Sequence, residues 1–187
     1  MSLKKYFLLM ILFFVAGIGY GQRYFTKSGK LAFDATTPSS PEKIKGKSHT
    51  AVCVLDTKTG ALQFSVLMKG FEFDRALMQE HFNENYVESD KFPKSEFRGT
   101  VTANDKINYT QDGKYKVEVK GTMTLHGESK EVVTNGELKV DNGKIKLEAN
   151  FDVLLADYKV SIPGLVADKV SKIAKIEVDC ALELFKN

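Results

Sequence analysis

Several long segments of this sequence alternate strictly between apolar and polar residues, and this alternation limits the fold more than any other feature. From 115 to 125 the odd positions are apolar or glycine, whereas the even positions are lysine, glutamate or threonine. The pattern recurs in 62–68, 145–153 and 176–184. A period of two puts one row of side chains in a core and the other in water. Each segment is therefore predicted to be a half-buried strand.

Short turn clusters separate these segments. They are Asp56 to Gly60, Asp112-Gly113 and Asp141-Asn142-Gly143. The last two are strong hairpin signals, because glycine tolerates the positive backbone angle that tight hairpin turns need. We therefore expect an all-β, antiparallel meander.

Periodicity alone does not separate a sandwich from a barrel. Bulky residues on the inward rows favour a barrel with a cavity: Phe64, Met68, Phe97, Met123 and Phe151. Gly121 lies in the middle of its strand, where a missing side chain leaves room or permits a bend. The alternative is a filled core with a bulge at Gly121, and the residues alone leave both readings open.

One segment, between Gly70 and Phe97, reads as a helix. Asp74 is a candidate N-cap, and Pro93 predicts that the helix stops before the Lys91-Phe92-Pro93 corner. Three apolar residues then follow one another at four-residue spacing on one face: Met78, Phe82 and Tyr86. This face must be buried, so the helix is a candidate lid or plug for an apolar interior.

A second short helix is conceivable near the C-terminus. Val166 to Ala174 has helical spacing, but the same segment could be a plain connection between two strands. If the region forms a rim around a barrel mouth, three residues are the candidates to face a ligand: Tyr158, Ile162 and Leu165.

The N-terminus has the pattern of a secretory signal. Lys4 and Lys5 precede the apolar run 6–18, and Gly19-Tyr20-Gly21 supplies the small residues of a cleavage site. We expect cleavage after Gly21, export to the periplasm or the medium, and a mature domain of 22–187. A retained N-terminal anchor is the alternative, although the run is short for a stable membrane insertion.

Removing residues 1–21 leaves 187 − 21 = 166 residues and takes away two lysines and no acids, so the net charge falls from +3 to +1. A near-neutral surface does not suggest a nucleic-acid partner. The small basic run of Lys43, Lys45 and Lys47 adjoins Glu42 and has no interleaved aromatic residue. We interpret it as a solvated loop or strand edge.

Reactive groups are sparse, so we predict neither an enzyme nor a cofactor or metal site. The imidazoles His49, His81 and His126 lack the paired spacing of a zinc site. No nucleophile elbow, phosphate-binding loop or dinucleotide turn occurs. Glutamates recur at every fourth position from 80 to 88, but such a stripe is usually the solvated face of a helix.

Cys53 and Cys180 are the two thiols of the chain. Export would make a disulfide chemically feasible, but a bond requires neighbouring strands in matched register. Both residues also suit buried positions as small apolar side chains. The sequence leaves the disulfide open.

Two blocks of the sequence resemble the YceI-like family of exported lipid- or polyisoprenoid-binding proteins. The first block holds His81-Phe82, Tyr86-Val87-Glu88 and the 91–93 corner, and the second runs from Gly121 to Gly127. The resemblance implies a lipocalin-like extended antiparallel barrel with an amphiphile along its axis. Two departures concern the opening strand, which leads into a polar, proline-containing stretch and lacks a histidine, and Met123, where leucine is more usual.

On this basis we expect a non-catalytic protein that carries or sequesters a polyisoprenoid, an isoprenoid quinone or a fatty acid derivative. The candidate wall residues are Phe33, Phe64, Val66, Met68, Phe97, Val101, Met123, Leu125, Phe151 and Val153, and the candidate gate residues are Phe71, Phe73, Met78 and Phe82. The alternative is an interaction or stress-related protein with a filled core that binds a protein partner through its rim or edge. The sequence carries no marker that decides between a monomer and a homodimer.

Overall fold

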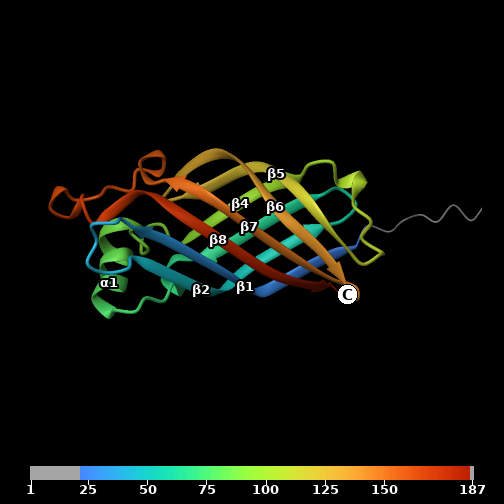
Figure 1. The fold of residues 1–187 in the computed structure, drawn as a ribbon, viewed down its shortest axis with the longest axis horizontal. Helices are drawn as coiled ribbons and strands as arrows, with labels where there is room; N and C mark the ends of the chain where they lie inside the picture. Colours follow the sequence, from blue (N-terminus) through green and yellow to red (C-terminus); the bar gives the residue numbers. More distant parts are fainter. Residues whose placement is uncertain (1–21, 186–187) are drawn as a thin grey trace, which may run out of the picture.

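The computed structural model describes residues 22–185, and this part of the chain forms a closed, eight-stranded antiparallel barrel (Figure 1). Each strand pairs with the next one in the sequence, and β8 pairs with β1 to close the barrel. Closure pairs both edges of the sheet. The predicted all-β antiparallel barrel is confirmed, with strands β1 Arg23–Thr36, β2 Lys45–Asp56, β3 Ala61–Leu67, β4 Lys94–Val101, β5 Gly113–Leu125, β6 Glu128–Asp141, β7 Lys144–Leu154 and β8 Val170–Leu184.

Two hairpin turns have both central residues in the left-handed region. Asn142 and Gly143 (φ 49° and 74°) join β6 to β7, as the turn cluster predicted, and His126 and Gly127 (φ 51° and 76°) join β5 to β6. These turns match the right-handed twist of the strands that they connect. The prediction at Asp112-Gly113 was wrong: Gly113 is the first residue of β5, has no left-handed φ, and follows a longer connection across residues 102–112.

Gly121 allows two strands to approach closely. It lies directly opposite Gly99 of β4, and a Cβ added at Gly121 would lie 2.3 Å from the carbonyl oxygen of Arg98. The pairing of β4 with β5 has no register shift at this point, so the bulge considered as an alternative is absent from the described structure. The bulges lie instead in β1, on both sides of Gly29.

The predicted helix is shorter than its sequence pattern. The α-helix α1 covers Ala76–His81, and a π-helical turn, η2, continues it over Phe82–Tyr86. Its N-cap is Arg75 rather than Asp74, and the cap makes no side-chain hydrogen bond. The helical segment ends before the 91–93 corner, as Pro93 predicted.

No second α-helix forms near the C-terminus of the described residues. A single 3₁₀ turn, η5, covers Gly164–Val166, and β8 begins at Val170. Ile173 and Ala174 instead pair with β7, opposite Leu154 and Val153. Cross-strand pairing thus prevails over a weak helical spacing in a segment too short to be a stable helix by itself. The other short turns are η1 Met68–Gly70, η3 Asn104–Lys106 and η4 Leu155–Tyr158.

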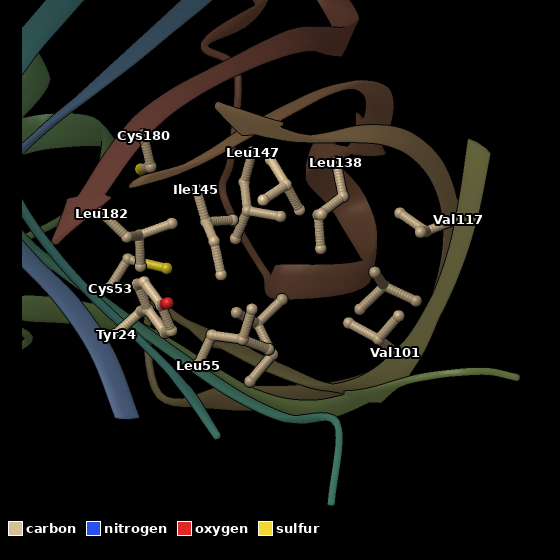
Figure 2. Close-up of a cluster of buried hydrophobic side chains, with 13 residues drawn as sticks. Tyr24, Cys53, Leu55, Val101, Val117, Leu138, Ile145, Leu147, Cys180 and Leu182 are labelled. Carbon is tan, nitrogen blue, oxygen red and sulfur yellow. The ribbon is translucent and has the colours of Figure 1, made fainter. Parts of the chain in front are cut away.

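The interior is divided into two halves. The half near the C-terminal end of β8 is filled by a cluster of buried side chains from several strands, which Figure 2 shows in close-up. The half near α1, at the opposite end of the barrel in Figure 1, is hollow. The filled half contains Tyr24, Leu55, Val101, Leu138, Val140, Ile145 and Leu182. Both sequence interpretations, a cavity and a filled core, therefore apply to different halves of one barrel.

The predicted signal segment 1–21 lies outside the described residues. Within 22–185, no helix has the length and apolar character needed to cross a bilayer.

Candidate ligand-binding cavity

The hollow half of the barrel encloses a cavity of about 520 Å³. This size falls within the range of roughly 300–1,000 Å³ that is usual for small-molecule sites. Strands from around the whole barrel contribute to its wall, and α1 with η2 lies across its mouth. The cavity is therefore a candidate ligand site.

Most residues predicted from the sequence to contact a ligand do line this cavity. Their shared property is a position on an inward row of a strand or on the inner side of the 71–86 segment. They are Phe33, Phe64, Val66, Met68, Phe71, Phe73, Met78, Phe82, Phe97, Met123, Leu125, Phe151 and Val153. The structure thus brings together residues that are up to 120 positions apart in the sequence, from 33 to 153.

Four predicted residues lie elsewhere. Val101 follows the inward row of β4 into the filled half, where it is buried against Leu55 and its neighbours. Tyr158 is buried beside the wall rather than in it, and Ile162 packs on a small cluster around Ala35. Leu165 is 91% exposed, because η5 turns its side chain away from the barrel. An inward row continues beyond the end of a cavity, so the sequence gives no sign of where the cavity stops.

Four phenylalanines form an aromatic cluster at the mouth. Phe82 stacks on Phe33 with ring centroids 5.3 Å apart, and it also contacts Phe71 and Phe73 at 5.6 and 5.0 Å. Gly46 makes room for the cluster, since a Cβ there would lie 2.5 Å from the ring of Phe33. The cluster attaches the helical segment to β1 at the mouth of the cavity, which is the position expected of a lid or plug.

Sequence reasoning missed much of the wall that β7 and β8 contribute. Leu147, Ala149, Ile176 and Val178 line the cavity, as does Leu31 of β1. The signal was present, since the first four belong to inward rows of the alternating segments. They were not singled out because their side chains are smaller than phenylalanine and methionine.

In the described structure, the charged groups at the mouth of the cavity are separate from those along its wall. Arg75 and Glu42 form an ion pair of 2.7 Å there, and Lys169 lies on the same rim. Three more glutamates contribute to the wall, but their carboxylates pair with lysines on strand faces that point outward: Glu96 with Lys94, Glu137 with Lys114 and Glu148 with Lys146. The interior is therefore apolar, with polar groups gathered at one end.

Cys53 and Cys180 lie at the inner end of the cavity as buried free thiols. Contact with the Cys180 thiol, and then burial, raise the pKa of Cys53 well above its ordinary value. A thiol with a raised pKa stays protonated at neutral pH and is a poor nucleophile. The two residues act in this structure as small apolar side chains.

The two sequence blocks that resemble the YceI-like family pack against each other. The ring of Phe92 from the 91–93 corner lies edge-on to His126, with centroids 4.7 Å apart. His126 also bonds through Nε2 to Glu88 at 2.7 Å and through Nδ1 to the carbonyl oxygen of Tyr158 at 3.0 Å. A Cβ at Gly127 would lie 2.5 Å from the Phe92 ring. The motifs thus join the helical segment to the barrel wall.

The three histidines do not converge on one site. His126 is occupied as described above, His81 lies at the mouth, and His49 is on β2. Within residues 22–185, no group of three or more histidine, cysteine, aspartate or glutamate side chains has a geometry that could hold a metal ion.

A closed antiparallel barrel with an apolar cavity that opens at one end is typical of the lipocalin-like class of barrel. The YceI-like domain family matches residues 19–182 of this sequence. The chain therefore belongs to the YceI-like family.

Solved structures share this fold at low sequence identity. A polyisoprenoid binding domain from Saccharophagus degradans, implicated in plant cell wall breakdown, has a TM-score of 0.76 at 12% identity, covering 89% of this chain and 100% of its own. BcnA from Burkholderia cenocepacia has a TM-score of 0.67 at 12% identity, covering 82% and 95%. The YceI protein of Campylobacter jejuni has a TM-score of 0.56 at 17% identity, covering 81% and 90%. No curated protein matches the sequence.

Proposed function

We propose that this protein is an exported, non-catalytic carrier that holds the hydrocarbon part of an amphiphile inside its barrel. The observation that carries the proposal is the cavity of about 520 Å³, whose wall is mostly apolar and whose rim carries the Arg75–Glu42 ion pair. Removing a hydrocarbon chain from water stabilises the complex by about 0.8 kcal/mol per methylene. A dry, apolar space with one polar end matches the two parts of such a ligand.

Membership of the YceI-like family and the fold shared with the polyisoprenoid binding domain of Saccharophagus degradans support a lipid or polyisoprenoid ligand. An isoprenoid quinone and a fatty acid derivative have the same two-part chemistry. The signal pattern of residues 1–21 supports export to the periplasm or the medium. The apolar character of the inner wall supports binding rather than catalysis.

Mass spectrometry of organic extracts from the purified mature protein tests the proposal. The wild type is expected to yield an amphiphile, whereas Phe151→Asp places a carboxylate in the apolar wall and is expected to yield little or none. Val133→Asp is the matched control, because Val133 is 60% exposed and the same change there leaves the cavity intact. Equal ligand content in the wild type and the folded Phe151→Asp variant would refute the proposal.

A further inference from the structure

We propose that a packed floor limits the ligand to a chain of about 20 carbons in extended form, a length that follows from strand rise and barrel tilt. The proposal rests on the proposed function and deepens it, since it assigns the ligand's length and orientation. Leu147, Cys53 and Cys180 form the floor together with Leu62 and Val119. Longer chains must then fold back or leave carbons outside.

The position of the floor follows from burial. Leu147 lines the cavity and is 8% exposed, whereas Leu138, directly opposite on β6, is 0% exposed and does not line it. Further along β7, Ile145 is also almost completely buried, as is Leu182, which pairs with it on β8. Beyond Leu147 the space between the strands is therefore filled by side chains, which Figure 2 shows pointing toward one another.

The depth of the cavity follows from strand geometry. Val170 lines the mouth and Cys180 the floor, ten residues apart on β8. Ten residues span roughly 33 Å of strand, and a strand tilt of about 40° reduces this to roughly 25 Å along the barrel axis. A staggered carbon chain advances roughly 1.3 Å per bond, so about 20 carbons fit.

The orientation of the ligand follows from the charges. Arg75, Glu42 and Lys169 border the mouth, whereas the five named floor residues carry only hydrocarbon or thiol side chains. A polar head at the floor would lose its hydration without gaining charged partners. The tail must therefore enter first, with the head remaining beside the Arg75 rim.

The test measures affinity against chain length for straight-chain carboxylic acids and the matching alcohols, from about 12 to about 28 carbons, by displacement of a fluorescent fatty acid. Affinity is expected to rise about fourfold per methylene until the tail reaches the floor and then to stop rising. The chain length at which affinity stops rising, called the break below, should be the same for acids and alcohols, because the floor contacts only the tail.

Two variants should move this break in opposite directions. Leu147→Ala deepens the cavity and is expected to move the break toward longer chains by about two carbons. Ala149→Leu adds bulk just above the floor and is expected to move it toward shorter chains by a similar amount. Val133→Ala, on the exposed face of β6, is the control and should leave the break unchanged.

If the break stays at one chain length in all folded variants, the proposal that the floor limits the ligand is overturned, while the proposed function remains intact. Continued gain in wild-type affinity up to the longest chains would also overturn it. Failure of every acid and alcohol to bind would refute the carrier function itself, and the floor proposal with it. Ala149→Leu keeps the test decisive if Leu147→Ala fails to fold.

Discussion

Facing glycines control how closely two strands approach. Gly99 and Gly121 are opposite each other, and each would place an added Cβ within 2.3 Å of a backbone carbonyl oxygen of the partner strand. The ring of Phe97 lies over the same spot, 2.8 Å from the Cβ position of Gly121. The two glycines thus allow β4 and β5 to approach closely, and they leave room for the ring of Phe97, which lines the cavity.

Gly121→Ala is expected to destabilise the protein by about 2–4 kcal/mol, because the clash involves backbone atoms that cannot rotate away. The free energy of unfolding in urea measures the effect. Gly164→Ala is the matched control, since a Cβ there has no neighbour within 4 Å and the backbone is not left-handed. Similar stability of the two variants would contradict the close approach of β4 and β5.

The Asp34–Lys45 pair links β1 to β2 next to the mouth, with 2.8 Å between Nζ and Oδ2. Burial raises the pKa of Asp34, but hydrogen bonds from Lys45 and Thr36 outweigh it and lower the pKa from 3.8 to about 2. Because the folded pKa lies below the unfolded one, the contribution to stability is complete above pH 4 and is lost as the pH falls toward 2.

We therefore expect Asp34→Asn to remove part of the acid sensitivity of unfolding. The difference between wild type and variant should be about 1 kcal/mol at neutral pH, after allowance for solvent screening of this half-exposed pair, and should disappear only below pH 2. Urea unfolding at several pH values measures it. A difference that is constant across the acid range would show that Asp34 contributes by packing alone.

At the scale of elements, the helical segment combines two attachments to the barrel. Its inner face holds the aromatic cluster, in which Phe82 contacts three other phenylalanine rings. The chain just after it is held by the contacts of Glu88 and Phe92 with His126. The first attachment consists of apolar contacts at the mouth, whereas the second fixes the corner to a hairpin. The helical segment is therefore held at two separate places, one at the mouth and one at the hairpin between β5 and β6.

Phe82→Ala is expected to speed exchange of a bound fluorescent fatty acid roughly tenfold, since about 1.4 kcal/mol of packing in the closed state would be lost. Stopped-flow displacement measures the rate. Glu84→Ala, on the exposed side of the same turn, is the control. Unchanged exchange in Phe82→Ala would mean that ligands bypass the helical segment.

At the scale of the whole molecule, the two halves of the barrel divide stability from binding. The filled half has fully buried residues such as Leu55 and Leu138, and it can supply much of the hydrophobic stabilisation of a single domain. The hollow half gives up such packing to keep a space that a guest could fill. An empty apolar cavity lowers stability. The tightly packed, filled half offsets this loss.

The sequence by itself determined the strands, the inward rows and the apolar nature of the wall, because side-chain alternation follows directly from backbone geometry. It also located the tight Asn142-Gly143 turn and the helical segment. Only the tertiary structure decided that the segment after Val166 joins β8, that Val101 belongs to the filled half and Phe97 to the cavity, and that Leu165 faces solvent. These outcomes depend on which side chains from distant strands meet at the same level of the barrel, and a local pattern carries no information about that level.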